Sequence, residues 1–151
     1  MRVRPGTAAD APRALEIWRA AVDATHRFLS AEHRLEIDGI VSGFLPEGVL
    51  WMVDDQSEGS WRPVGFLVMD GEMIDALFVD PAVHGRGFGS ALIAHALTLA
   101  PEALVDANEQ ASNALPFYEA RGFVRIGRSE LDSDGRPYPI VHLRYAGVAG
   151  A

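Results

Sequence analysis

The stretch "LFVDPAVHGRGFGSALIAHAL" (Leu77 to Leu97) decides how this chain folds. It runs from an apolar strand, through a proline and a cluster of glycines, into an apolar helix. Gly85, Gly87 and Gly89 stand at every second position, where the helix is about to begin. Glycine there costs backbone entropy, so the cluster indicates that something must lie close to the bare backbone.

The composition is that of one globular domain with an acidic surface. The chain has 151 residues, 48% of them hydrophobic, and a net charge of −8 at pH 7. We expect a single domain over residues 1–146 and a short flexible tail over 147–151. The sequence shows no basic block, no apolar run of transmembrane length and no signal-peptide pattern at its start. We therefore expect a cytoplasmic protein with no nucleic-acid and no membrane partner.

Two missing residue types narrow the chemistry. The chain has no cysteine, which excludes thiolate nucleophiles and zinc–thiolate sites and fits a reducing compartment. It also has no lysine, which excludes a P-loop lysine and Schiff-base chemistry on the chain. The five histidines show no metal-binding spacing, so we expect no metal site. No Ser–His–Asp motif is evident either.

Hydrophobic periodicity predicts a mixed sheet flanked by helices, an α/β (α+β) domain. Asp10 is the expected cap of the first helix, and the polar segment 54–60 and the "DSDG" turn at 132–135 are expected connections. The predicted elements are a strand at 1–5, helices at 11–26 and 30–45, strands at 49–53, 62–70 and 72–80, a helix at 87–99, a strand at 103–108, a helix at 113–122, and strands at 123–131 and 138–145.

The glycine cluster can be structural, or it can form one of several kinds of phosphate-binding site. It can be a tight strand-to-helix turn, because glycines are common in such turns. It can be an anion cradle, in which bare backbone amides and the positive end of a helix hold a phosphate. As a dinucleotide-binding cradle it is weak: Ser90 follows the third glycine and the fingerprint is incomplete, although Asp106 supplies an acid at a suitable distance.

Two motifs in order make one family resemblance. The run His84-Gly85-Arg86-Gly87-Phe88-Gly89, after a strand and at the head of a helix, resembles motif A of the GCN5-related N-acetyltransferase (GNAT) family. The run "NALPFYEARGF" (Asn113 to Phe123) is similar to the family's second motif, and "VDATHRFLS" and "GRPYPIVHLRY" also resemble bacterial members. The resemblance covers essentially the whole chain. It implies the GNAT fold, a mostly antiparallel mixed sheet of about seven strands with about four helices.

The resemblance implies that the cradle holds the pyrophosphate of acetyl-CoA and that the preceding strand binds the pantetheine arm. Two positions depart from the family pattern: His84 replaces an Arg or Gln, and Ala111 stands where an Asn is common. The implied coenzyme A-binding residues are Leu77, Phe78, Val79, His84, Gly85, Arg86, Gly87, Phe88, Gly89, Ser90, Asn108, Asn113 and Tyr118.

Acetyl transfer to an amine needs a proton acceptor, a polarised carbonyl and a donor to the departing thiolate. Tyr118 stands where the family has its general-acid tyrosine, although it can equally be a packed aromatic residue. A backbone amide near Leu77 or Phe78 is the implied polarising group. His26, Asp75 and Glu109 are the candidate bases, each with an ordinary structural alternative.

We therefore expect an acetyl-CoA-dependent N-acetyltransferase that transfers an acetyl group directly to a primary amine of a small molecule or peptide. The alternative is a non-catalytic acyl-CoA-binding or sensing module of the same fold, and a third possibility is a small NAD-binding protein. The oligomeric state, monomer or homodimer, stays open.

Overall fold

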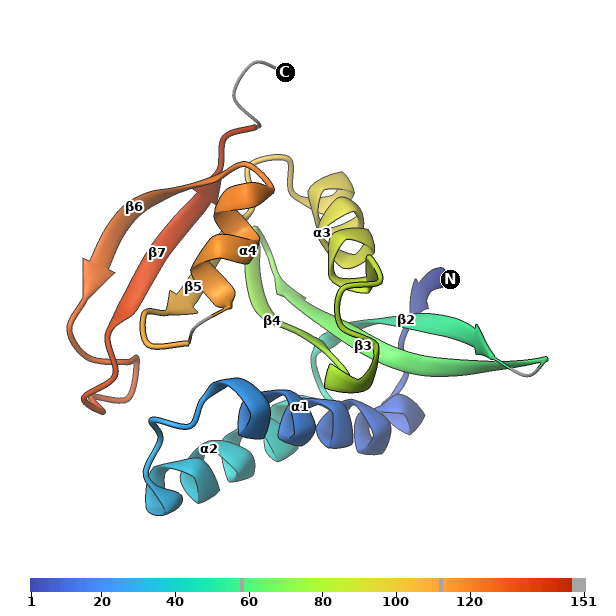
Figure 1. Ribbon diagram of the computed structural model, residues 1–151, viewed down its shortest axis with the longest axis horizontal. Coiled ribbons are helices and arrows are strands. Elements are labelled where there is room, and N and C mark those ends of the chain that lie inside the picture. Colours follow the sequence, from blue (N-terminus) through green and yellow to red (C-terminus); the bar gives the residue numbers. More distant parts are fainter. Residues whose placement is uncertain (58, 112, 148–151) are drawn as a thin grey trace.

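A mixed sheet of seven strands forms the middle layer, and helices cover both of its faces (Figure 1). The structure, a computed structural model, describes residues 1–57, 59–111 and 113–147. The strands lie in the order β1-β2-β3-β4-β5-β7-β6. The elements are β1 (Arg2–Pro5), α1 (Ala11–Thr25), α2 (Ala31–Phe44), β2 (Val49–Ser57), β3 (Ser60–Asp70), β4 (Met73–Val79), α3 (Phe88–Leu99), β5 (Leu104–Asn108), α4 (Ala114–Ala120), β6 (Phe123–Ser129) and β7 (Ile140–Tyr145). The predicted α/β fold is confirmed.

Two hydrophobic cores, one on each face of the sheet, hold the layers together. The core beneath α1 and α2 includes Ile17, Met52 and Phe66, all fully buried. The core on the other face joins α3 and α4 to the sheet and includes Leu92 and Leu143. Each fully buried side chain of this size contributes roughly 1.5–3 kcal/mol. Because both faces are covered, the middle of β3 reads as an almost unbroken apolar run.

Strands β4 and β5 form a parallel pair, and they separate soon after they meet. The other neighbouring strands are antiparallel. The β4–β5 ladder has only two register pairs, Met73 with Leu104 and Ile74 with Val105, although β4 continues to Val79. Beyond Ile74, the backbone of β4 is therefore not paired with β5. A wedge opens between the two strands.

A β-bulge at Asp75 marks the point where the strands part. Val68 of β3 pairs with Ala76 and Met69 pairs with Ile74, so Asp75 has no partner on β3. The extra residue reverses the alternation of side chains: Ile74 belongs to the core of α3 and α4, and Ala76 belongs to the core of α1 and α2. Bulges of this kind re-aim side chains and are frequent beside active sites.

The prediction of a polar connection at 54–60 is wrong. Strand β2 extends to Ser57 and β3 begins at Ser60, so the hairpin is much tighter. The physical reason lies at Asp54, which is buried within the sheet and accepts hydrogen bonds from Arg2 (2.9 Å) and Arg4 (2.7 Å) of β1. A charged residue that is paired in this way is compatible with a strand.

Two smaller expectations also need correction. Strand β7 begins at Ile140 and not at 138, because Pro139 has no N–H for the ladder and Tyr138 turns its side chain towards α2. Asp10 stands at the N-cap position of α1 but makes no cap bond there. Its carboxylate accepts from the Thr7 amide (2.9 Å) and pairs with Arg4. Of the predicted tail, residues 148–151 lie outside the described residues.

Candidate active site

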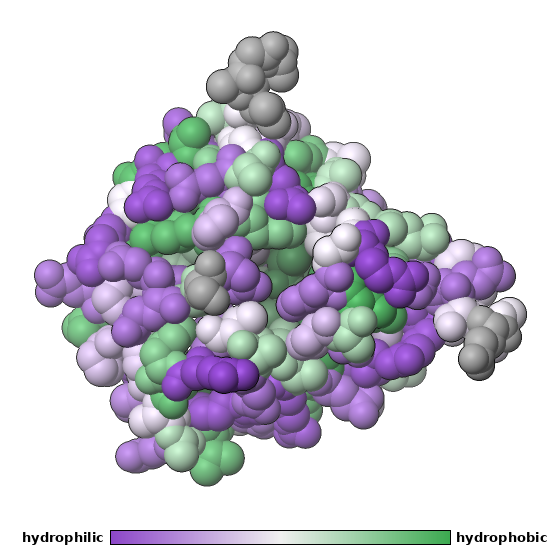
Figure 2. Space-filling model, viewed as in Figure 1, coloured by the Kyte–Doolittle hydropathy of each residue, from purple (hydrophilic) through white to green (hydrophobic). Residues whose placement is uncertain are grey.

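A cleft of about 540 Å³ opens where β4 and β5 separate. Figure 2 shows a hollow near the centre of one face, with hydrophobic residues in its depth and a largely hydrophilic surface around it. The cleft is lined by the end of α1, by β4 and β5, by the start of α3 and by α4. Of the residues predicted to bind coenzyme A, all except Arg86 line this cleft.

The N-terminus of α3 presents a row of free backbone amides to the cleft. Gly85 and Gly87 have left-handed φ angles of 78° and 88°, which cost a residue with a Cβ about 1–2 kcal/mol. Ala91 is the first residue of the helix whose amide reaches a carbonyl, that of Gly87 at 3.0 Å. The amides of residues 88–90 therefore have no acceptor within the helix. Together with the helix dipole they favour an anion, so this turn fits a diphosphate.

Gly89 has a packing role in addition to its place in the cradle. A Cβ at position 89 would lie 2.9 Å from ring atoms of Phe117, so the glycine lets α4 approach the first turn of α3. Arg121, just after α4, lies 3.7 Å above the Phe117 ring and donates to Oγ of Ser90 at 2.9 Å. Arg121 also lines the cleft. Arg121 was not among the predicted site residues, since one arginine at the end of a helix carries no signal by itself.

Three of the predicted cofactor residues direct their side chains elsewhere. Nε2 of His84 donates to the carbonyl of Val79 at 2.9 Å, which ties the loop to the end of β4. Arg86 turns towards Asp55 of β2, at 3.4 Å. Phe88 is buried in the core beneath α3. The side chains of these three residues therefore do not take part in the cradle, and only their backbone atoms can contribute to it.

The two asparagines of the opposite wall both line the cleft. Asn108 accepts a hydrogen bond from the Gln110 amide at 3.1 Å. Asn113 is the N-cap residue of α4, and its side chain makes no cap bond, so it is available to a ligand. Ala111, where the family often has Asn, is buried, and it is not part of the cleft wall.

Tyr118 lies in the cleft wall with its ring held by aromatic neighbours. The side chain is buried, and the ring packs edge-on against Phe117 (5.1 Å between centroids) and Phe123 (5.4 Å). Burial raises the pKa of the Tyr118 phenol well above its ordinary value of 10, so the hydroxyl keeps its proton at neutral pH. No side chain in the described part of the chain hydrogen-bonds to this hydroxyl, so its proton is available to a ligand.

His26, at the end of α1, lines the cleft from the other side. Burial lowers the pKa of His26 to about 4, so the imidazole is neutral at pH 7. The Thr25 hydroxyl donates to the carbonyl of Ala21 (2.8 Å) and lies 2.7 Å from Nδ1 of His26. Because the hydroxyl has only one proton, Nδ1 donates to it, and Nε2 retains the lone pair. The ring can accept a proton, but only weakly.

Asp75 lies at the bulge and lines the cleft. The residue is exposed overall, but partial desolvation of its carboxyl raises the pKa, and the negative charges of Asp70 and Asp106 raise it further. A carboxylate in such surroundings is a stronger proton acceptor than an ordinary aspartate. Asp75 combines cleft position with increased basicity.

Glu109 lies apart from the other two candidate bases. It is not part of the cleft wall, and it forms an exposed ion pair with Arg128 of β6. The hydrogen bond from Arg128 lowers the pKa of Glu109. Its position and its charge partner both make it the weakest of the three candidates.

The structure also brings together a chain of polar side chains that the sequence pattern does not indicate. Asp106 of β5 is the register partner of His142 on β7, and Oδ1 of Asp106 lies 2.6 Å from Nδ1 of His142. Nε2 of His142 lies 2.7 Å from Oγ of Ser129 on β6. Asp106 lines the cleft, whereas His142 and Ser129 do not. A Ser–His–Asp arrangement therefore exists despite the absence of a sequence motif, but its serine lies outside the cleft.

A metal site and a membrane-spanning helix find no support in residues 1–57, 59–111 and 113–147. No group of three or more His, Asp or Glu side chains in this part of the chain is arranged to hold a metal ion. None of the helices described there has both the length and the apolar character needed to span a bilayer.

Comparison with known proteins decides the family. A family model described as an acetyltransferase (GNAT) domain matches residues 50–139. This chain belongs to the GNAT acetyltransferase family. It is 47% identical over 146 residues to the peptidyl-lysine N-acetyltransferase YjaB of Salmonella typhimurium, covering 96% of this chain and 98% of the relative. It is 48% identical over 132 residues to YjaB of Escherichia coli K12, covering 87% and 88% of the two chains.

The GNAT fold is equally clear from solved structures. The solution structure of apo-form YjaB from Escherichia coli matches with a TM-score of 0.89 and 44% identity, and it covers 97% of this chain and 98% of that one. The resemblance read from the two motifs is thus confirmed, and family membership makes the chain an acetyltransferase.

Proposed function

We propose that this protein is an acetyl-CoA-dependent N-acetyltransferase that transfers an acetyl group directly to the side-chain amine of a peptide lysine. The observation that carries the proposal is one cleft lined by an anion cradle, an unpaired strand backbone and the Tyr118 hydroxyl. The choice of acceptor is supported by the names of the two YjaB relatives, which are peptidyl-lysine N-acetyltransferases.

The cofactor would supply an activated acetyl thioester. The backbone amides from Gly85 to Ser90, before and at the start of α3, would hold its diphosphate, with Arg121 as a nearby cation; the amide of His84, predicted to belong to this row, donates to the carbonyl of Pro81 at 3.3 Å. The backbone of β4 from Leu77 to Val79 is not paired with β5, and it would bind the extended arm as an added strand binds a sheet edge. Such positioning is a large source of rate when two bound reactants must meet.

Tyr118 would donate its proton to the departing sulfur. Its raised pKa keeps the proton on the phenol at neutral pH, and the packing of Phe117 and Phe123 fixes the direction of the ring. A backbone amide of β4 just beyond the bulge, near Leu77, would polarise the acetyl carbonyl.

Asp75 is our choice of proton acceptor for the incoming amine. It lines the cleft and has a raised pKa, whereas His26 is a weak base and Glu109 is occupied by Arg128. The charges of Asp75 and Asp106 would also attract the lysine ammonium to the cleft. Ser129 lies outside the cleft, which favours direct transfer over an acyl-serine route.

The test is an acetylation assay with Tyr118→Phe. Purified protein, acetyl-CoA and peptides with one internal lysine should yield acetyl-lysine, detected by mass spectrometry, together with free CoA. Tyr118→Phe should lower kcat by about 100-fold, the smaller end of general-acid effects, and leave the Kd for CoA unchanged. Tyr145→Phe, which removes a tyrosine hydroxyl at the end of β7, is the matched control.

Other results would point elsewhere. Equal turnover by wild type and Tyr118→Phe would remove the acid role of Tyr118. Binding of CoA in a calorimeter without any acetylated product across a broad amine library would indicate the non-catalytic acyl-CoA module. Thermal protection by NAD and not by CoA would indicate a dinucleotide-binding protein.

A single functional domain over residues 1–146, a cytoplasmic location and the choice between monomer and homodimer stay predictions. The first is supported by the one sheet that runs from β1 to β6.

A further inference from the structure

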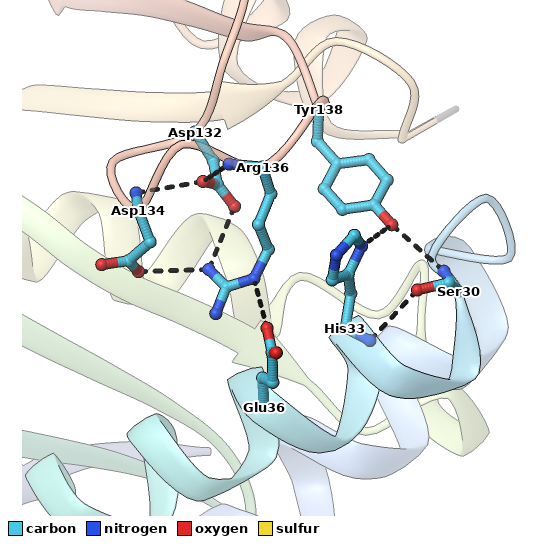
Figure 3. A network of polar contacts seen from close by, with 7 residues as sticks. All are labelled: Ser30, His33, Glu36, Asp132, Asp134, Arg136 and Tyr138. Atoms are coloured by element: carbon cyan, nitrogen blue, oxygen red, sulfur yellow. Dashed lines mark hydrogen bonds and ion pairs between the residues drawn. The ribbon is translucent and has the colours of Figure 1, made fainter.

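Two connections that are distant in sequence are joined by a network of polar contacts (Figure 3). One links α1 to α2 and carries Ser30, and the other links β6 to β7 and carries Tyr138. The Tyr138 hydroxyl accepts a hydrogen bond from the Ser30 amide at 3.1 Å, and it shares a second one with Nδ1 of His33 at 2.5 Å. Tyr138 itself is buried, and both bonds are partly buried.

An ion-pair cluster supports the same junction. Nε of Arg136 donates to Glu36 of α2 at 3.1 Å, and Nη1 of Arg136 contacts Asp132 (3.3 Å) and Asp134 (3.1 Å) of its own connection (Figure 3). Only 11% of the Arg136 side chain is exposed. The β6–β7 connection is thereby held in one shape and fastened to α2.

A row of aromatic rings runs from this junction to the cleft. The ring centroid of Tyr138 lies 5.8 Å from that of Phe28, and Phe28 lies 5.3 Å from His26. His26 lines the cleft, whereas Tyr138 and Phe28 do not. The turn between them is closed by a hydrogen bond from the Leu29 amide to the carbonyl of His26 at 3.2 Å. Tyr138 therefore reaches the His26 wall of the cleft through this turn.

The chain next to Tyr138 is attached to the residue that follows β5, the strand of the opposite wall of the cleft. The Glu109 amide, directly after β5, donates to the carbonyl of Pro139 at 2.9 Å. Tyr138 thus stands between the wall made by the end of α1 and the wall made by β5. Removal of its hydroxyl would leave the Ser30 amide and His33 without this partner and would release the turn that carries His26.

We infer that Tyr138 is a positioning residue for the cleft wall at the end of α1, which we assign to the incoming amine because the cofactor cradle lies at the start of α3: Tyr138 holds the turn Thr25–Ser30, and with it His26, in place. The inference rests on the proposed function for its effect on catalysis. The cofactor cradle lies at the start of α3, and no residue of α3 takes part in the hydrogen bonds of Tyr138. The cofactor should therefore bind normally when Tyr138 is altered.

The first test needs no acceptor. The pKa of His26, lowered to about 4 by burial, is measured by NMR titration in wild type, Tyr138→Phe, His33→Ala and Tyr145→Phe. Loss of either bond of the Tyr138 hydroxyl should let water reach the ring and raise the pKa of His26 towards its ordinary 6.5. Tyr145→Phe removes the same atom from another tyrosine and should leave the value unchanged. The inference would be overturned if the pKa of His26 were the same as in wild type in both Tyr138→Phe and His33→Ala.

The second test separates acceptor from cofactor. With a peptide that contains one internal lysine, Tyr138→Phe should raise the acceptor KM by about 10-fold and change the Kd for CoA by less than twofold. The double variant with His33→Ala should be no worse than Tyr138→Phe alone, because the hydrogen bond that His33→Ala removes is one of the two that Tyr138→Phe removes. If the acceptor KM and the Kd for CoA rose by the same factor, the substitution would have loosened the whole cleft, and this result would contradict the inference. If wild type makes no acetyl-lysine, the proposed function fails, and the NMR result still decides the role of Tyr138.

Discussion

Single residues in this cleft take their properties from their surroundings. Asp75 and Asp106 both line the cleft, but Asp106 has His142 as a hydrogen-bond partner, whereas Asp75 lies at a bulge beside other negative charges. Two carboxyl groups in different environments can divide the work of attracting an amine and accepting its proton. The sequence supplied Asp75 as a candidate, but the basis for choosing it lies in its neighbours.

Asp75→Asn should slow transfer and stabilise the fold. The pKa of the Asp75 carboxyl is raised in the folded protein above its ordinary value, so the folded state binds this proton more tightly than the unfolded state does. At neutral pH the ionised carboxylate therefore destabilises the fold. The variant should have a higher Tm than wild type at pH 7, a gain that shrinks as the pH falls towards 4, and a kcat about 100-fold lower.

Calorimetric scans at pH 5 and pH 7.5, together with acetylation rates, check this prediction. Glu102→Gln is the control for net charge, because it removes a negative charge from an exposed turn that does not line the cleft. A lower Tm for Asp75→Asn at pH 7.5, or wild-type turnover, would contradict the role given to Asp75.

At the scale of elements, the first turn of α3 and the parting of β4 from β5 make the site. The turn was predictable, because glycines before a helix act on the local backbone. The parting was not, because it depends on the Asp75 bulge, which is visible only in the pairing of β3 with β4. A strand pattern in the sequence shows that β4 exists, but it does not show with which neighbour each residue pairs.

Gly85→Ala should weaken cofactor binding by about 10-fold, which corresponds to about 1.4 kcal/mol of backbone strain. The left-handed φ of 78° at Gly85 is required to present the amides of the cradle, and open space around the position leaves strain as the main effect. Gly71→Ala, at a φ of 57° in the β3–β4 turn, is the matched control. Gly71→Ala should lower the free energy of unfolding, measured by urea denaturation, by a similar amount, and it should bind CoA with wild-type affinity. Equal CoA affinity in the two variants, measured by calorimetry, would argue against the cradle.

On the scale of the whole molecule, ion pairs fasten the first strand to the sheet. Asp54 is buried in β2, and Arg2 and Arg4 of β1 both donate to its Oδ2. Asp54→Ala should lower the free energy of unfolding by about 2 kcal/mol, because two partly exposed guanidinium groups lose a buried partner. Urea denaturation measures the loss. CoA affinity of the folded variant should be unchanged, since Asp54 lies outside the cleft.

The order of the elements, the glycine turn and the tyrosine of the second motif were determined by the sequence alone, because periodicity, caps and glycines act over a few residues. Only the tertiary structure decided which side chains meet: Tyr138 with His33, Asp106 with His142, and Arg121 with Ser90. These partners are separated by 105, 36 and 31 positions. Their contacts depend on strand register and helix packing across the whole sheet, and no local pattern encodes them.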